Sequence, residues 1–571
     1  AGAFGASLNL LTDGFSQDAY GQISTSIGSY GTLRNNLKFS TGLLNDHIEI
    51  SGRLSKIKSD GYIDRARSDL ESYFLQAAYK DDNTLIKALM FGGHEITYQA
   101  WYGIDGQTLR DNRTFNPSGI YTDLNGNTQF YDNEVDNYKQ DHAQLLWNEQ
   151  ISDFWSTNIA LHYTRGRGYF EQYREADDFS TYGFEPLIVD GEEVNTTDLI
   201  RRRWLDNDFY GTVFSANYKK EKLDLIIGGG LNKYEGDHFG EVIWARYASN
   251  SSYRDRYYDD SSSKTDFNLY TKANYQLTDQ WSLYGDVQYR TVGYKANGED
   301  TGLVDDTFNF FNPKAGVTFD LNANNNFYLS YAVANREPNR NDYENGNPKP
   351  EKLNDFELGW RYVSPSVQVN TNVYYMNYKD QLVVTGELND VGAPLRENIG
   401  DSYRLGLEVD ANIILGEKFN LRPNIAISQN KNKDFFIDRD GMLQGLGDTN
   451  IAYSPGLVAG NVLSYMPCDA MNISLYSKFV GEQYLSNTDT EASKLDSYFT
   501  TDFNITYEIN MNSIVKSIVF SGLVNNIFNE KYVSNGYTYV DSWSTPGNSF
   551  EVQGYYPQAG TNFLLGATVN F

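Results

Sequence analysis

The 571-residue sequence holds one cysteine, 13 prolines and no long apolar run. One cysteine excludes an intramolecular disulfide framework and a cysteine-based zinc site. No segment approaches the roughly 18 consecutive apolar residues that a membrane-crossing helix needs, so an α-helical membrane protein is excluded as well. Basic residues are scarce too, since 47 Lys and Arg face 75 Asp and Glu and leave a net charge of −28. This acidic balance argues against a nucleic-acid partner.

Aromatic residues are abundant instead: 45 Tyr, 32 Phe and 8 Trp make up 15% of the chain, beside 49 Gly. Such residues are typical of strands and of membrane interfaces. Apolar and polar residues alternate in segments such as 47–55, 281–290 and 563–571. Because a period of two places alternate side chains on one face of a strand, each segment reads as a strand with one apolar face.

Short and long connections alternate between these segments. Tight turns are predicted near residues 44–46, 81–83, 152–153, 220–221, 278–279, 323–325, 364–365, 416–417 and 467–469. Long connections are predicted at about 96–140, 166–205, 235–263, 336–353, 431–455, 482–497 and 528–559. Counting strands between them gives about 22, an even number, as in bacterial outer-membrane barrels.

This layout predicts an all-β fold: a transmembrane antiparallel β-barrel of about 22 strands, with short periplasmic turns and long extracellular loops. A bilayer offers no water to backbone N–H and C=O groups, so a spanning sheet must close on itself. Its outer face must be apolar while its lumen is polar, which explains the low average hydropathy. Strands of soluble β-sandwiches and propellers also alternate apolar and polar residues. Their short and long connections, however, are not separated at opposite ends of the fold.

Several short segments then occur in a fixed order. They are NPKAGV (312–317), FYLSYA (327–332), REP (336–338), NPKPEKL (347–353), FELG (356–359), ENIG (397–400), LGLE (405–408), LVNNIFNEKY (523–532) and a last strand ending at Phe571. Together they resemble the barrel signature of TonB-dependent outer-membrane receptors. The resemblance implies a receptor in the outer membrane of a Gram-negative bacterium that imports a scarce metal chelate, most often a ferric siderophore, and that is energised through TonB.

The start of the chain departs from the family pattern. Residues 1–10 resemble the last strand of the plug domain that precedes the barrel in this family. We therefore expect residues 1–18 to be a remnant of the plug and its linker, and residues 19–571 to be the barrel. The resemblance implies that most of the plug, a signal peptide and the segment that engages TonB would precede residue 1 in an intact receptor of this family.

Basic and aromatic residues gather in two of the predicted loops. The first cluster is Arg165, Arg167, Tyr169, Arg174, Arg201, Arg202, Arg203 and Trp204, and the second is Trp244, Arg246, Arg254, Arg256, Tyr257 and Tyr258. Guanidinium groups pair with carboxylates, aromatic faces pack against flat groups, and arginines in an acidic protein attract anions. We expect ligand binding there. The alternatives are lipopolysaccharide phosphates or ion pairs with nearby Asp177, Asp178, Asp206 and Asp208.

Further aromatic residues lie in the predicted third and last loops. They are Trp101 and Tyr102, and Trp543, Tyr555 and Tyr556. Contact with ligand is one interpretation. The interfacial girdle, where Trp and Tyr anchor the membrane surfaces, is the favoured one.

Asp123, Asn125 and Asn127 surround Gly126 and resemble a calcium-binding loop. The EF-hand spacing is incomplete, because no Glu stands at the twelfth position counted from Asp123. An Asx-rich turn is the commoner meaning of such a run. Calcium in the extracellular loops is the one metal that the sequence suggests, and no cofactor is expected.

The five histidines are scattered, and no nucleophile motif accompanies them, so no enzyme activity is expected. The partners that follow are outer-membrane lipid and lipopolysaccharide, a small metal chelate, and TonB with ExbB and ExbD through the plug. An accessory surface lipoprotein is an open alternative. Import of cobalamin or haem is the alternative function, and the calcium-like loop would favour cobalamin. A passive porin or an adhesin barrel is the alternative from another class.

Overall fold

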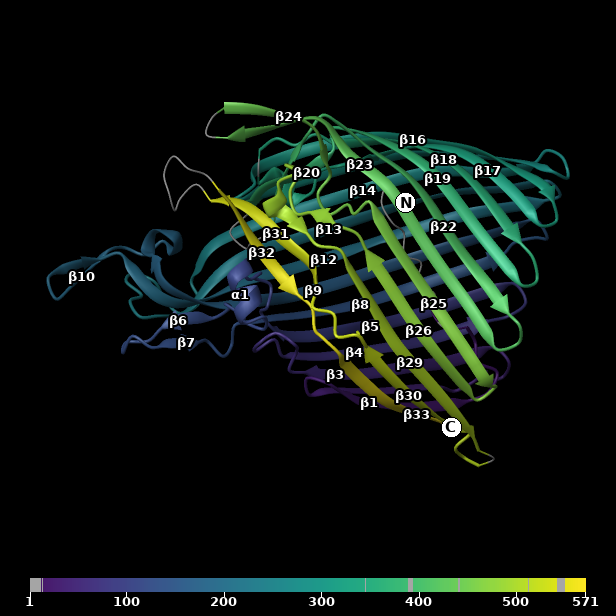
Figure 1. The fold of residues 1–571 in the computed structure, drawn as a ribbon, viewed down its shortest axis with the longest axis horizontal. Helices are drawn as coiled ribbons and strands as arrows, with labels where there is room; N and C mark the ends of the chain where they lie inside the picture. The colour runs from purple at the N-terminus through teal and green to yellow at the C-terminus, as the bar shows by residue number, and fades with distance from the viewer. Residues whose placement is uncertain are drawn as a thin grey trace.

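The computed structural model describes residues 12, 14–344, 346–388, 394–439, 442–511, 513–541 and 550–571. Its main sheet has 23 strands, of which β24 (Met442–Asn450) is a side hairpin, so 22 strands form the barrel (Figure 1). The barrel strands are β1 (Tyr20–Gly28), β2 (Thr32–Ser40), β3 (Ile48–Ser59), β4 (Ser68–Lys80), β5 (Thr84–Tyr98), β8 (Val135–Gln150), β9 (Trp155–Asp178), β12 (Thr196–Lys220), β13 (Leu223–Ala245), β14 (Arg256–Gln276), β15 (Trp281–Gly298), β16 (Gly302–Asn322), β17 (Asn325–Arg336), β18 (Glu351–Val363), β19 (Val367–Lys379), β22 (Asp401–Leu415), β23 (Phe419–Arg439), β25 (Leu457–Cys468), β26 (Met471–Val480), β29 (Tyr498–Asn510), β30 (Ser517–Asn525) and β33 (Asn562–Asn570).

Strands β1 and β33 close the barrel. They pair antiparallel from Gln22 opposite Asn570 to Gly28 opposite Leu564, while β33 pairs on its other side with β30. Both edges of the sheet are therefore used, as a sheet surrounded by lipid requires. The closed antiparallel barrel of about 22 strands that the sequence predicts is confirmed.

The connections at one end, here called the turn end, are short. Each turn predicted from the sequence lies within one or two residues of an observed short connection. The connection 511–516 between β29 and β30 is a further turn, which the sequence did not predict. The opposite end, here called the loop end, carries the long connections. Two connections there are short, 29–31 and 299–301. Connection length alone therefore does not identify the loop end of every hairpin.

Alternation along the strands separates an apolar outer face from a polar lumen. On β15, Trp281, Leu283, Val287 and Tyr289 are 42–47% exposed on the outer face. The helices in the loops are short: α1 (Gly106–Asp111), α2 (Arg340–Tyr343), η1 (Phe179–Tyr182) and η2 (Glu491–Ser493). No helix in the described part of the chain is both long and apolar enough to cross a membrane.

One side of the barrel rises far beyond the rest. Strands β9, β12, β13 and β14 have 21–25 residues, whereas β1 and β2 have nine. Two hairpins extend this wall, as Figure 1 shows at its left: β6 (Ile120–Thr122) with β7 (Thr128–Phe130), and β10 (Leu187–Val189) with β11 (Glu192–Val194). The predicted loops 166–205 and 235–263 are wrong in their limits, because the β-ladders continue through most of both.

Smaller pairs fill the other long connections. They are β20 (Leu382–Leu388) with β21 (Pro394–Asn398), β27 (Gln483–Tyr484) with β28 (Lys494–Leu495), and β31 (Val533–Asp541) with β32 (Phe550–Pro557). Residues 1–11 and 13 of the predicted plug remnant, and Trp543, lie outside the described residues. The first barrel strand begins at Tyr20, and the assignment of residues 1–18 to a plug stays a prediction.

Candidate functional site

The arginine-rich cluster of residues 165–204 lies on two opposite faces of the high wall, and on strands rather than in a loop. Cross-strand register places one set on the same face as the exposed, outward Leu161. That outer set is Arg165, Arg167 and Tyr169 on β9 and Arg202 and Trp204 on β12. The lumenal set is Arg174 on β9 and Arg201 and Arg203 on β12. The two sets cannot contact the same ligand from one side of the wall.

The outer arginines make close ion pairs. Arg165 binds Asp206 and Asp208, each at 2.5 Å. Arg202 Nε donates to Glu171 Oε2 at 2.7 Å. Asp206 and Asp208, two of the alternative partners predicted from the sequence, therefore pair with Arg165. A ligand role for the outer set stays a prediction.

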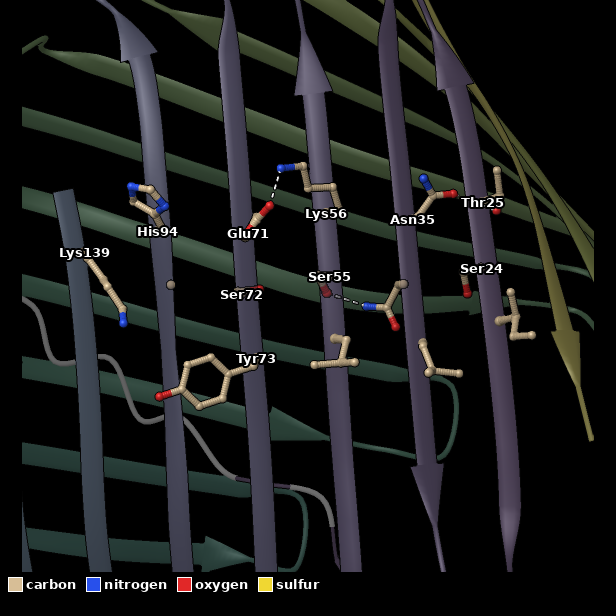
Figure 2. A pocket seen from close by; sticks show the side chains of 15 residues that line it. Ser24, Thr25, Asn35, Ser55, Lys56, Glu71, Ser72, Tyr73, His94 and Lys139 are labelled. Atoms are coloured by element: carbon tan, nitrogen blue, oxygen red, sulfur yellow. Dashed lines mark hydrogen bonds and ion pairs between the residues drawn. The ribbon is translucent and has the colours of Figure 1, made fainter. Parts of the chain in front are cut away.

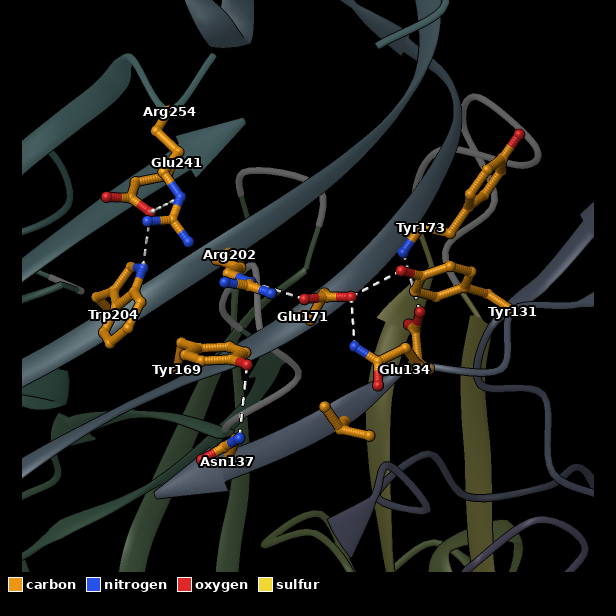
Figure 3. A network of polar contacts seen from close by, with 12 residues as sticks. Tyr131, Glu134, Asn137, Tyr169, Glu171, Tyr173, Arg202, Trp204, Glu241 and Arg254 are labelled. Carbon is orange, nitrogen blue, oxygen red and sulfur yellow. Dashed lines mark hydrogen bonds and ion pairs between the residues drawn. The ribbon is translucent and has the colours of Figure 1, made fainter. Parts of the chain in front are cut away.

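A buried network surrounds Glu171, whose exposure is 1% (Figure 3). Besides Arg202, it accepts hydrogen bonds from the Tyr131 hydroxyl at 2.6 Å and from Asn133. Nearby Glu134 accepts from the backbone N–H of Tyr173 at 2.9 Å. Burial raises the pKa of the Glu134 carboxyl to about 7, although the Tyr173 N–H works in the opposite direction. The network fixes the connection 99–134 to the wall.

The second predicted cluster is divided as well, because Trp244 and Arg256 lie on the outer face whereas Tyr258 lies on the lumenal face. The Trp244 ring stacks on Tyr173 with centroids 6.3 Å apart, and Arg246 pairs with Asp198. In the connection before β8, the Trp101 ring meets the edge of Phe170 at 5.4 Å, on the lumenal side. Its neighbour Tyr102 accepts a long hydrogen bond of 3.4 Å from Gln172. Trp101 and Tyr102 therefore pack within the loop end rather than in a lipid-facing girdle.

Two lumenal arginines of the first cluster are fixed by neighbours. Arg174 Nε donates to Asp177 at 3.0 Å, and Arg201 donates to Gln172 Oε1 at 2.9 Å. Arg203 differs in position, because its Nε donates to the Tyr258 hydroxyl at 2.9 Å beside a hollow in the lumen.

That hollow has a volume of about 440 Å³ and lies at the loop end between the high wall and the connection 337–350. We call it the upper lumen site, and its lining includes Glu95, Asp136, Tyr138, Phe170, Arg203, His238, Tyr258, Asp300, Arg340 and Glu344. Arg203 on β12 and Arg340 on α2 line it, together with the carboxyls of Glu95 on β5, Asp136 on β8, Asp300 and Glu344. The aromatic rings of Tyr138, Phe170 and Tyr258 lie between them. The two guanidinium groups beside these rings can pair with an anionic group of a flat ligand, while the four carboxyls repel negative charge elsewhere on it.

Sequence reading found only Arg203 among the charged residues of this site. Tyr138 and His238 were missed, although the alternation of β8 and β13 would have placed both in the lumen. Arg340 follows the REP segment that carried the resemblance, but nothing in the sequence shows that this connection folds back into the barrel.

Arg340 pairs with Asp260 at 3.2 Å and with Glu344 at 3.5 Å, and further ion pairs hold its connection in place. Glu337, at the start of the connection, binds Lys264 at 2.5 Å and Arg290 at 2.6 Å. Farther along, Tyr343 donates to Asp306 at 2.7 Å. These contacts join the connection 337–350 to the lumenal faces of β14, β15 and β16, so α2 forms a fixed wall of the site.

Two further hollows lie lower in the barrel wall. The larger, about 890 Å³, is inside the lumen and is lined by Tyr20, Arg34, Lys38, Arg53, Phe74 and Phe91, among others. We call it the lower lumen hollow. A groove of about 760 Å³ lies on the outside over β1–β5 and β8 (Figure 2). There the outward Ile23, Leu37 and Leu54 lie next to Lys56 and Lys139, which is an apolar surface bordered by charge.

The calcium-like residues form the tip of the β6–β7 hairpin. Asp123 Oδ1 accepts from the backbone N–H groups of Asn125 and Asn127, each at 2.9 Å, which is an Asx turn. Within the described residues, no three His, Cys, Asp or Glu side chains are grouped so as to hold a metal ion. Calcium binding stays a prediction.

The family described as TonB dependent receptor-like, beta-barrel matches residues 79–527. No relative was found among curated proteins. The ferric-catecholate import receptor Fiu from E. coli K12, in its closed form, superposes with a TM-score of 0.69 at 16% identity, over 98% of this chain and 82% of Fiu.

Two other solved structures resemble the barrel as well. The ferric citrate transporter FecA gives a TM-score of 0.72 at 15% identity, over 98% of this chain and 80% of FecA. The copper transporter OprC gives 0.72 at 16% identity, over 98% and 81%. At these identities the likeness shows the fold alone.

Proposed function

Because the chain belongs to the TonB-dependent receptor-like β-barrel family, we propose that it is an outer-membrane receptor that imports a scarce metal chelate, with energy supplied through TonB. The chelate that we propose is a ferric siderophore. The upper lumen site is the observation that carries this proposal. It places Arg203 and Arg340 beside three aromatic rings in a hollow of about 440 Å³ at the loop end.

The lining suggests how a chelate would be held. Its anionic edge would face Arg203 and Arg340, and its flat groups would pack on Phe170 and Tyr258. The carboxyls of Glu95, Asp136, Asp300 and Glu344 would repel the anionic edge everywhere except beside the two arginines, which sets its orientation. Because α2 is fixed by Glu337, this surface exists before the ligand arrives, which lowers the ordering cost of binding.

The same proposal places the loop end outside the cell and the apolar outer face in lipid. The outer groove of Figure 2 would then receive outer-membrane lipid or lipopolysaccharide, with acyl chains on Leu37 and Leu54 and polar groups near Lys56. Calcium, a surface lipoprotein, and the coupling to TonB, ExbB and ExbD through a plug are parts of the proposal that rest on the resemblance.

Growth under metal limitation tests the proposal. A deletion strain should fail to grow on one ferric chelate as sole iron source, and the wild-type gene should restore growth. A gene carrying Arg203→Gln together with Arg340→Gln should restore it poorly, because the anionic edge loses both partners. Lys295→Gln, which breaks the exposed Lys295–Asp305 pair outside the predicted sites, is the control and should restore growth fully.

Normal growth of the deletion strain on every ferric siderophore offered would contradict the ferric assignment. Loss of growth on cobalamin or haem alone would establish the alternative cargo. Uptake that continues without TonB would favour a passive porin.

A further inference from the structure

Exposed aromatic side chains gather on the outer face of the high wall, near its top (at the left in Figure 1). Trp244 on β13 is 45% exposed, and its ring stacks on that of Tyr173 on β9. Tyr121 of the β6–β7 hairpin also packs on Tyr173, with ring centroids 4.4 Å apart. Its neighbour Ile120 is 46% exposed. We call these four residues the outer aromatic patch.

The outer aromatic patch is too far from the lipid-facing band to be an interfacial girdle. Tyr163 and Tyr210, directly opposite each other on β9 and β12, are the exposed aromatic pair at the upper edge of that band. Tyr173 lies ten residues beyond Tyr163, which is about 33 Å along the strand at about 3.3 Å per residue. With a strand tilt of roughly 40°, the patch stands about 25 Å above the girdle. Acyl chains therefore do not cover it.

The outer aromatic patch faces away from the lumen and is held rigidly. Tyr173 shares its face with the outward Leu161, whereas Arg174 beside it is lumenal. The Tyr173 backbone N–H donates to Glu134 at 2.9 Å, and its hydroxyl donates to Asp198 at 3.0 Å. Fixed aromatic anchors lose little conformational freedom on binding, and Tyr and Trp are enriched at the centres of protein–protein interfaces. A lumenal ligand cannot reach the patch, so it serves a molecule outside the barrel.

The chain next to the outer aromatic patch is strongly acidic. Residues 175–198 contain eight Asp and Glu and no Lys or Arg. Two of the eight are paired with arginines. The other six are exposed, and we call them the acidic edge: Glu175, Asp178, Glu185, Asp190, Glu192 and Glu193. Glu175 borders the patch directly, because its carboxylate accepts a hydrogen bond from the backbone N–H of Thr122, next to Tyr121.

The cations around the patch do not offset this charge, because each already has a carboxylate partner. The pairs are Arg202 with Glu171, Arg246 with Asp198, and Arg254 with Glu241. The surroundings of the patch are therefore negative.

This negative charge selects among the molecules that can stand beside the wall. The phosphates of lipopolysaccharide are repelled by the acidic edge. A second copy of this chain, upright in the same membrane, would bring an identical acidic edge against it. A basic protein surface is attracted, and an apolar centre with a charged rim is the usual anatomy of a protein interface.

We infer that the outer aromatic patch is a docking surface for a second protein at the cell surface, which places an apolar pocket over Trp244 and a basic rim against the acidic edge. The inference goes beyond the proposed function, since it gives this face a partner and no part in holding cargo. It rests on the proposed function only for the placement of the loop end outside the cell.

Site-specific photo-crosslinking in the bacterium that carries the gene tests the inference. The photoreactive residue p-benzoylphenylalanine replaces Trp244, which keeps an aromatic group in the patch. At the control position it replaces Leu303, which is 86% exposed at the loop end of another wall. Irradiated cells should give one discrete, protease-sensitive adduct from position 244 and none from position 303. The adducted peptide, identified by mass spectrometry, should contain more Lys and Arg than Asp and Glu.

Charge reversal links the adduct to the acidic edge. Glu192→Lys with Glu193→Lys should lower the adduct yield roughly fivefold or more, because the basic rim then meets like charge. Glu482→Lys with Glu491→Lys is the matched control, since both carboxylates are exposed at the loop end outside the acidic edge. It should leave the yield within about twofold. All yields are normalised to the heat-modifiable, folded receptor.

Three results would overturn the inference: no protein adduct at position 244, an adduct with lipopolysaccharide or a second receptor instead, or a yield that reversal of the acidic edge leaves unchanged. Labelling of intact cells distinguishes these from failure of the proposed function. A membrane-impermeant maleimide should label Leu124→Cys, a position that is 85% exposed in the β6–β7 connection, and leave Cys468 at the turn end unlabelled. If Leu124→Cys is not labelled, the outward placement of the loop end is contradicted, and the proposed function with it.

Discussion

At the scale of single residues, Glu134 is the most unusual side chain of the high wall. It is 3% exposed, stands close to buried Glu171, and accepts a hydrogen bond from the Tyr173 N–H. Burial raises its pKa from 4.5 to about 7. A carboxyl with a raised pKa in the folded state binds more protons there than in the unfolded chain, so its contribution to stability falls as pH rises from 4.5 to about 7.

Glu134→Gln should therefore stabilise the wall at high pH. The amide oxygen still accepts from Tyr173, but no buried charge has to be held. We expect the opening free energy at the Tyr173 amide to rise by up to about 3 kcal/mol at pH above 7, and the gain to vanish below pH 4.5. Hydrogen exchange of this amide, with variant and wild type compared at equal pH, measures it. Glu192→Gln on exposed β11 is the control, and a gain that is the same at both pH values would contradict the account.

At the scale of elements, the connection 337–350 is a fixed part of the lumen. Glu337 lies between Lys264 and Arg290, and Arg290 also donates to Asp266 at 2.8 Å. A buried carboxylate with two cationic partners ties the connection to β14 and β15. Because Arg340 follows three residues later, this anchor also sets one side of the upper lumen site.

Glu337→Gln should release the connection. Removing one partner of a buried ion pair typically costs about 3 kcal/mol or more, so hydrogen exchange in residues 337–344 should speed up on the order of a hundredfold. Chelate binding should weaken too, because Arg340 loses its fixed position. Asp305→Asn breaks the exposed Lys295–Asp305 pair on neighbouring strands and should change exchange by less than about fivefold. Equal effects of the two changes would show that Glu337 is no special anchor.

At the scale of the whole molecule, period-two alternation and turn residues were enough to predict the barrel. Both signals depend on neighbouring residues only. The ends of the long strands in the high wall were not predictable in this way. Arg165 and Arg203 lie on strands whose many charged residues are typical of a loop. Which residues of different strands stand side by side depends on the register between strands, which the tilt of the closed barrel sets and no single segment encodes. The inward fold of residues 337–350 depends on Lys264 and Arg290, which are distant in sequence.

The location of bound iron tests the central claim most directly. Crystals of the receptor with the ferric chelate that supports growth should give an iron anomalous-scattering peak in the upper lumen site, between Arg203 and Arg340. A peak on the outer wall beside Arg165 and Arg167, or a lumen without iron at saturating chelate, would contradict the account.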